Sequence, residues 1–239
     1  FRGGSEDVRN PKPITLGDAD AIADPFQAPS IIGVAPVLQG SGKVSFGGES
    51  TTTMITGITP AYGTVRSYGV TEGEFFNESH MLGQASVVLL GPEVAERLFG
   101  RTEGIIGETV RIEGRPFRVL GIMESKGGSG FSNEDDQVFV PLTTAQVRLI
   151  RRSTRDRVDL LIVQAIESKS VPQAGEELAQ ILRQRHRTEI GGDDFTILTQ
   201  QDFLNTAGTI TNVLTIFLGG IAGISLLVGG IGIMNIMLV

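Results

Sequence analysis

The pattern of apolar and polar positions divides the chain into two parts. Up to about residue 200, short apolar segments alternate with polar segments and glycine-rich turns. From Phe203 to Val239 no charged residue occurs, and from Val213 onward Ile, Leu, Val, Gly and Met dominate. An apolar stretch of about 18 or more residues is typical of a transmembrane helix. We therefore expect a folded region followed by one membrane helix, the chain being a segment of a larger membrane protein.

The first 60 residues predict a short helix followed by strands. Thr15 and Asp18 have the spacing of a capping box, in which two side chains satisfy unpaired N–H groups at a helix start. Apolar residues then recur at helical spacing until Pro25, which cannot continue a helix. Within residues 31–60, apolar positions alternate with polar ones and β-branched residues are frequent, which favours strands.

Residues 86–150 predict a unit of strand, helix, hairpin, strand and helix. An apolar strand is followed by Pro92 near the start of a helix, and Gly100 lies where that helix should end. Alternating strands flank Glu113 and Gly114, a pair suited to a hairpin turn. We expect this unit to form a compact lobe.

The last polar and apolar stretches predict a strand at 159–163 and a helix that a capping box at Ser170 begins. A further strand is predicted around Phe195 and Ile197, and Thr199–Asp202 should start the membrane-directed helix. The sum is an α+β fold, with residues 15–60 and 159–199 coming together around the central unit.

Composition narrows the chemistry that the chain can perform. The chain has 20 Lys and Arg against 27 Asp and Glu, a net charge of −7, so binding to a nucleic-acid backbone is not expected. It has no Cys, which excludes disulfides, thiolate nucleophiles and Cys-bound zinc. It has two His, so a triad or a His-rich metal site would depend on one of them.

Catalytic motifs are missing from the sequence. There is no phosphate-binding loop, dinucleotide fingerprint, nucleophile elbow or His-Glu-x-x-His. Residues 133–136 (Asn-Glu-Asp-Asp) have the side chains for Ca²⁺ but not the spacing of a dedicated loop, so a solvated acidic loop is favoured. His80 and His186 are interpreted as surface side chains rather than catalysts. We predict no catalytic, cofactor-binding or metal-binding residues.

The membrane helix carries two stripes. Small residues that allow close helix approach recur along it: Gly219, Ala222, Gly223, Ser225, Gly229 and Gly232. Upstream, apolar residues spaced alternately four and three apart form a heptad seam: Phe203, Ala207, Ile210, Leu214, Phe217 and Ile221. The alternatives are general glycine enrichment for the first stripe and an amphipathic face packed on the folded region for the second.

The length and flanking charges of this helix suggest its placement. A helix over residues 200–239 would be about 60 Å long, whereas the hydrocarbon core is about 30 Å thick. We therefore expect a stalk, residues 200–213, before a transmembrane helix, residues 214–239. No Lys or Arg follows Arg187, and a flank without basic residues is not expected in the cytoplasm. Residues 1–213 should therefore be extracytoplasmic.

Several segments resemble one family, the MacB-type ABC transporter permeases. Residues 224–239 (ISLLVGGIGIMNIMLV) resemble the family's second membrane helix, and residues 87–100, 107–121 and 135–146 resemble its extracytoplasmic core domain. The resemblance implies a two-lobed domain: a discontinuous α/β lobe near the membrane, residues 1–85 and 158–200, with an inserted β-rich lobe, residues 86–157.

The resemblance also implies a function and partners. Family members act as dimers of permease copies in the bacterial cell membrane, with a cytoplasmic ABC ATPase that holds ATP and Mg, and some work with a periplasmic adaptor and a TolC-type outer-membrane channel. The chain would be a non-enzymatic part of an exporter that transmits motion to the periplasm. Two other functions stay open: a permease-like scaffold that regulates a cell-wall hydrolase, and the ligand-sensing ectodomain of a membrane receptor.

Overall fold

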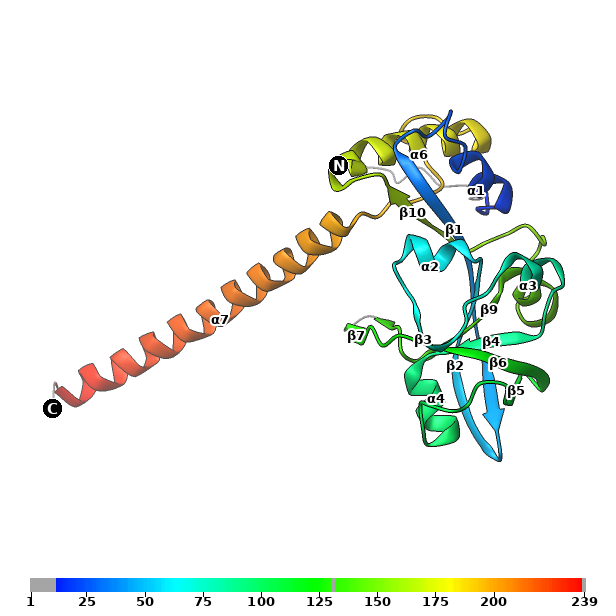
Figure 1. Ribbon diagram of the computed structural model, residues 1–239. Helices are drawn as coiled ribbons and strands as arrows, with labels where there is room; N and C mark the ends of the chain where they lie inside the picture. Colours follow the sequence, from blue (N-terminus) through cyan, green and yellow to red (C-terminus); the bar gives the residue numbers. More distant parts are fainter. Residues whose placement is uncertain (1–11, 130–131, 238–239) are drawn as a thin grey trace. The chain divides into compact units, whose positions relative to one another are not determined.

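The computed structural model describes residues 12–129 and 132–237, and the chain divides into two units, Phe1–Phe195 and Thr196–Val239 (Figure 1). The first unit mixes strands and helices, and the second is dominated by one long helix, α7 (Gln200–Met237). The prediction of an α+β fold followed by one helix long enough to span a membrane is confirmed.

One strand runs through most of the first unit. β1 (Ile31–Phe46) pairs antiparallel with β10 (Leu160–Ala165) through residues 31–37, and then with β2 (Glu49–Ile58) through residues 38–46. The two halves of β1 therefore have different neighbouring strands in the same sheet (Figure 1). Strands were predicted in this region, but not one strand of this length.

The sheet has the order β10-β1-β2-β9-β4-β6-β3, with β5 pairing with both β1 and β6. The two parallel pairs, β2 with β9 and β4 with β6, lie inside this order. The remaining strands of the sheet are β3 (Val70–Gly73), β4 (Val87–Leu90), β5 (Thr109–Ile112), β6 (Arg115–Met123) and β9 (Gln137–Pro141). A separate two-stranded sheet joins β7 (Gly128–Ser129) and β8 (Ser132–Asn133).

Short helices cover the sheet at several points. They are α1 (Leu16–Ile22), α2 (Ala61–Val65), α3 (Glu78–Leu82), α4 (Pro92–Phe99), α5 (Leu142–Thr144), η1 (Ala145–Leu149), η2 (Ser168–Ser170) and α6 (Val171–His186). η1 is a single π-helical stretch that continues α5. α1 and α6 pack together beside the β10 end of the sheet (Figure 1).

Three apolar clusters form the core within the described residues. One joins α1, α6 and the first residues of β1, with Ile22, Ile31 and Leu182 buried in it. A second joins the far half of β1 to α4 and the strands that follow residue 86, and it includes Leu38 of β1 and Val88 of β4. The third lies between α2, β3 and β9. Apolar packing thus crosses the expected lobe boundary at residue 86, and the division into lobes stays a prediction.

The sequence correctly predicted the helix ends and turns that depend on neighbouring residues. The capping box at Thr15 forms as expected, Gly100 ends α4 with a φ of +65°, and Glu113 and Gly114 make the β5–β6 turn with φ values of +50° and +76°. Such left-handed conformations suit glycine and tight hairpin turns.

Two predicted features are wrong. No strand forms at Phe195 and Ile197, where the described chain is irregular and pairs with no strand. Ser170 does precede α6, but its side chain makes no capping hydrogen bond. The start of α6 instead relies on Pro172, which lacks the N–H that a cap would satisfy.

Candidate functional site

α7 begins at a capping box that the sequence predicted. The backbone N–H and the hydroxyl of Thr199 donate to Asp202 Oδ2 over 2.8 and 2.7 Å, and the Asp202 N–H donates back to Thr199 Oγ1 over 3.3 Å. The helix then continues without a break to Met237. Within residues 200–231, the most apolar window of 18 residues has a mean hydropathy of 2.1, enough for a membrane span by length and composition.

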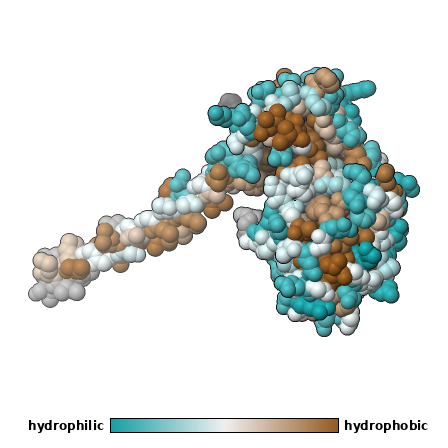
Figure 2. Space-filling view, viewed as in Figure 1, coloured by the Kyte–Doolittle hydropathy of each residue, from teal (hydrophilic) through white to brown (hydrophobic). Residues whose placement is uncertain are grey.

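The two predicted stripes lie on this helix. The seam residues Phe203, Ile210, Leu214, Phe217 and Ile221 are all exposed, and apolar side chains cover much of α7 (Figure 2). Their spacing places them along one helical face, which is the arrangement a packed partner helix would require. Their role in packing stays a prediction.

The small residues form a second, smoother surface. A methyl group added at Gly219, Gly223 or Gly229 would meet no atom within 4 Å. Ala222 and Ser225 are exposed as well. Gly232 lies outside the residues whose exposure the structure describes. This surface is free to accept a close helix neighbour, which remains an expectation.

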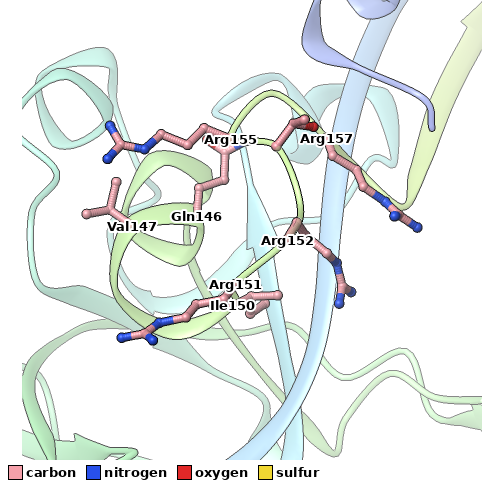
Figure 3. A pocket seen from close by; sticks show the side chains of 8 residues that line it. Gln146, Val147, Ile150, Arg151, Arg152, Arg155 and Arg157 are labelled. Carbon is pink, nitrogen blue, oxygen red and sulfur yellow. The ribbon is translucent and has the colours of Figure 1, made fainter. Parts of the chain in front are cut away.

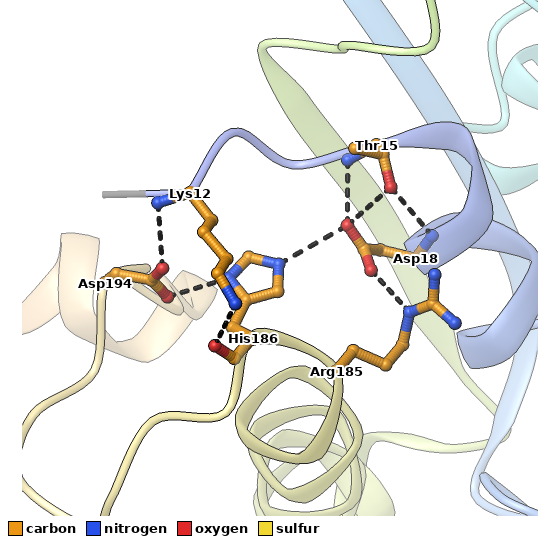
Figure 4. Close-up of polar contacts among 6 residues, drawn as sticks. All are labelled: Lys12, Thr15, Asp18, Arg185, His186 and Asp194. Atoms are coloured by element: carbon orange, nitrogen blue, oxygen red, sulfur yellow. Dashed lines mark hydrogen bonds and ion pairs between the residues drawn. The ribbon is translucent and has the colours of Figure 1, made fainter. Parts of the chain in front are cut away.

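A buried polar cluster joins the two ends of the first unit (Figure 4). His186, at the end of α6, is only 5% exposed. Its Nδ1 lies 2.8 Å from Asp194 Oδ1, and its Nε2 lies 3.4 Å from Asp18 Oδ2. The backbone N–H of Lys12 also binds Asp194, and Lys12 Nζ donates to the carbonyl oxygen of His186 over 2.5 Å. The interpretation of His186 as a surface side chain is therefore wrong.

Asp18 is the centre of this cluster. Arg185 Nε donates to its Oδ1 over 2.5 Å, and the N–H and hydroxyl of Thr15 each donate to its Oδ2 over 2.8 Å. Burial alone would raise the pKa of Asp18, but the hydrogen bonds from Arg185, Thr15 and His186 outweigh burial and hold the pKa below its usual value. The cluster ties α1 to the end of α6 and to residue 194, six residues before α7.

His80 has a local role. Its Nδ1 accepts a hydrogen bond from the backbone N–H of Asn77 over 3.3 Å, while the Asn77 side chain accepts from the His80 N–H over 3.1 Å. The imidazole thus takes part in the cap of α3. No acid or nucleophile among the described residues is hydrogen-bonded to this ring, so the geometry gives it no catalytic partner.

The acidic loop is less solvated than its composition suggested. Glu134 forms an ion pair with Arg66 over 2.5 Å, and Asp136 forms one with Arg97 over 2.9 Å. Because both carboxylates are paired with arginines, the favoured interpretation of these residues as a solvated acidic loop is wrong for Glu134 and Asp136.

The third carboxylate, Asp135, organises the loop backbone. It accepts hydrogen bonds from the backbone N–H groups of Lys126 and Gly127 over 2.9 and 3.2 Å, and from the Ser125 hydroxyl over 2.6 Å. Its oxygens are therefore turned toward the protein rather than toward a shared centre. Within residues 12–129 and 132–237, no group of three acidic or His side chains is placed to hold a metal ion.

The comparisons with known proteins agree on one family. The model for the MacB-like periplasmic core domain matches residues 1–181. A macrolide export ATP-binding/permease protein, MacB of Bdellovibrio bacteriovorus, is 35% identical over 228 residues, which is 95% of this chain and 34% of the relative. A pyoverdine export ATP-binding/permease protein, PvdT of Pseudomonas entomophila, is 34% identical over 94% of this chain and 33% of its own length.

Solved structures share the fold. The periplasmic region of MacB from Actinobacillus actinomycetemcomitans aligns with a TM-score of 0.68, at 22% identity, over 86% of this chain and 89% of that one. The extracellular domain of YknZ, a noncanonical ABC-type transporter from Gram-positive bacteria, aligns with a TM-score of 0.64, also at 22% identity, over 78% and 91%.

The chain spans about a third of the length of the curated relatives it matches. Its relatives are ABC-transporter permeases with a periplasmic domain, and its own first unit has the fold of those domains. A helix long enough to span a membrane follows that unit, as expected for a membrane protein with an extracytoplasmic segment. On the match over residues 1–181, the chain belongs to the family of MacB-like periplasmic core domains.

Proposed function

We propose that the chain couples ATP hydrolysis by a cytoplasmic ABC ATPase to export or other work outside the membrane. The observation that carries this proposal is the unbroken helix α7, which contains both the stalk sequence and the membrane-length apolar run. A continuous hydrogen-bonded helix resists bending, so movement imposed at one end reaches the other. The chain itself would transmit motion and perform no chemistry.

The cargo class follows from the relatives. Two of them are named for the export of macrolides and of pyoverdine, which are organic molecules. We infer that the parent protein of this chain exports compounds of that kind and acts as a dimer of permease copies with an ATPase that binds ATP and Mg. A periplasmic adaptor and a TolC-type outer-membrane channel would complete the path where an outer membrane is present.

The two stripes of α7 have separate tasks in this mechanism. The seam from Phe203 to Ile221 packs against a helix of the partner copy or against another membrane helix of the same subunit. The glycine-rich face allows a second helix to approach closely inside the bilayer, where van der Waals packing replaces the hydrophobic drive. Both contacts make α7 part of a rigid assembly.

The test is a charge placed in the seam, using the whole transporter with its ATPase in vesicles. Ile210→Asp would bury an unpaired carboxylate, at a cost of several kcal/mol. Coupling between distant sites is commonly about 1–3 kcal/mol, a factor of about 5–150 in an equilibrium. We expect transport of a labelled cargo to fall by at least about tenfold, while ATP hydrolysis continues.

Asn212→Asp is the matched control, because it adds the same charge two residues away and off the seam. It should keep near-normal transport. If the two variants transport equally well, the seam does not couple the ATPase to the periplasm. The amount of each variant in the membrane is measured separately from transport. Wild-type amounts of both would confirm that the comparison concerns coupling rather than folding.

A further inference from the structure

The segment between η1 and β10 concentrates positive charge in an acidic chain. Residues 148–157 contain five arginines and one aspartate, whereas the whole chain has a net charge of −7. The arginines are Arg148, Arg151, Arg152, Arg155 and Arg157. Neither the fold nor the proposed coupling along α7 requires this concentration of charge.

A pocket of about 230 Å³ lies between η1 and this segment (Figure 3). Gln146, Val147 and Ile150 line it from the side of η1, and Thr154 and the arginines line it from the other side. π-helical turns are rare in proteins and are frequently found at functional sites. Here the π-helical turn presents Gln146 at the pocket.

Two of the residues that line this pocket carry buried donors without acceptors. Gln146 Nε2 and Arg157 Nε are buried, and neither finds a hydrogen-bond partner among the described residues. Both groups can only donate a hydrogen bond. Leaving a buried donor unpaired is costly, so a ligand with acceptor oxygens would stabilise side-chain rotations that bring these donors to the pocket.

The guanidinium groups of these arginines differ in their hydrogen-bond and ion-pair partners. Arg152 donates to Asp159 Oδ2 and to the carbonyl oxygen of Gln39, over 2.7 Å in each case, and is a structural contact. Arg151, Arg155 and Arg157 form no ion pair within the part of the chain that the structure describes. The segment keeps at least three cationic groups available.

These groups do not converge on one point. In Figure 3, Arg151 and Arg155 point to one side of the segment, and Arg157 points to the opposite side together with Arg152. One small anion could not contact Arg151, Arg155 and Arg157 together. An extended chain with several carboxylates could, because successive acidic side chains can reach separate guanidinium groups.

The segment is also anchored to the structure at its C-terminal end. The backbone N–H of Leu16 donates to the Asp156 carbonyl oxygen over 2.8 Å, and the N–H of Val158 donates to the Ile14 carbonyl oxygen over 2.9 Å. A partner bound here would therefore be held against the start of α1, beside a fixed part of the first unit.

We propose that residues 146–157 form a docking surface for an acidic segment of a partner protein. One carboxylate of the partner enters the pocket, and Gln146 and Arg157 turn their Nε2 and Nε donors toward it, while neighbouring carboxylates pair with Arg151 and Arg155. Charge-assisted hydrogen bonds of this kind give both affinity and orientation. The interaction does not depend on transport or on the seam of α7.

The experiment measures peptide binding to the full 239-residue chain in nanodiscs of zwitterionic lipid. The probe is a fluorescein-labelled peptide of alternating Glu and Ser, with a Gln and Ser peptide as the neutral comparison. We expect the acidic peptide alone to bind. Arg151→Gln with Arg155→Gln should raise its Kd about tenfold or more, and Gln146→Leu should raise it several-fold without any change of charge.

The matched control is Arg101→Gln with Arg115→Gln, which removes two exposed arginines elsewhere in the first unit. It should change the Kd less than twofold. Equal losses in both double variants, or no effect of Gln146→Leu, would overturn the proposal, because binding would then follow net charge alone. Full displacement of the peptide by inorganic phosphate at constant ionic strength would also overturn it and assign a small-anion site instead. Thermal unfolding of each variant verifies that it is folded.

Discussion

Asp18 links α1 to the end of α6 through several hydrogen bonds. Its carboxylate is 3% exposed and contacts side chains from both α1 and α6. A buried carboxylate is stable only when its oxygens are hydrogen-bonded. Here one side chain caps a helix, pairs with an arginine and faces a histidine, so removing its charge affects all three at once.

We expect Asp18→Asn to lower the free energy of unfolding by about 2 kcal/mol at pH 7, since hydrogen bonds to a charged group contribute about 1.5–3 kcal/mol and Arg185 is partly exposed. For a unit of this size that is about 4–8 °C in Tm. Asp20→Asn, on the exposed side of the same helix, is the control and should change Tm little. A Tm for Asp18→Asn within error of the control would contradict this account.

The pH dependence has a definite sign. The folded pKa of Asp18 lies below the ordinary value of 3.8, so the stabilisation is complete above that value and is lost as the pH falls through the folded pKa. The difference in unfolding free energy between the wild type and Asp18→Asn should therefore be constant from pH 7 to pH 5 and shrink below about pH 4. Denaturant titrations at several pH values measure this difference.

The sequence could not reveal the burial of His186. The residues around it are arginines at the end of a helix, a pattern typical of a solvated helix end. The groups that enclose it are Asp194, eight residues later, and Asp18, at the opposite end of the first unit in sequence. Burial of one polar side chain depends on such distant neighbours, which no local pattern contains.

At the scale of elements, two glycines show how the surroundings decide a substitution. Gly175 lies in α6, and a methyl group there would meet no atom within 4 Å. Gly91 caps α4, and a methyl group there would lie 2.3 Å from the Asp135 carbonyl oxygen and 2.8 Å from that of Gln137. Backbone atoms cannot move aside as a flexible side chain can.

We expect Gly175→Ala to stabilise the first unit by about 0.5–1 kcal/mol, the usual advantage of Ala over Gly inside a helix. Gly91→Ala should destabilise it by about 1–3 kcal/mol, as overpacking does. Chemical denaturation of the two variants under the same conditions gives both values. A stabilised Gly91→Ala variant would show that the close backbone atoms around Gly91 do not exclude a larger residue, and a destabilised Gly175→Ala variant would contradict the account of Gly175.

Elements with a local cause were predictable, and those with a distant cause were not. The helix caps at Thr15 and Thr199 and the turn at Glu113 and Gly114 arise from side chains within three residues of one another. The strand expected at Phe195 had the right residues but found no partner strand to pair with. The length of β1 was likewise unpredictable, because it is set by two different partners, β10 and β2.

At the scale of the whole molecule, the membrane helix was the clearest prediction because it needs only composition and length. An arginine near the middle of a membrane span costs about 2.5–3.5 kcal/mol for insertion. We expect Leu226→Arg to reduce the fraction of the chain that stays in membranes after alkaline extraction. Leu204→Arg, in the expected stalk, should leave that fraction unchanged, and the reverse ranking would move the span toward residue 200.

The docking surface at residues 146–157 was not predictable. The five arginines are visible in the sequence, but the pocket is formed by the π-helical turn and by the return of the chain to β10. The family could be recognised from sequence segments, and its fold is the one observed. What the sequence could not supply is which polar groups lack partners once the chain is folded, since that depends on every neighbour at the site.

The division of β1 between two partners has a consequence for biosynthesis. α1 and the first half of β1 leave the ribosome first, but β10 and α6, against which they pack, are made more than 100 residues later. Until then Ile22 and Ile31 lack the apolar partners that β10 and α6 supply, while the second half of β1 can already pair with β2. The nascent chain therefore carries an unfinished, aggregation-prone segment until α6 has been made. Chaperones that recognise exposed apolar segments should bind this segment, and should release it only after residue 186 has been synthesised.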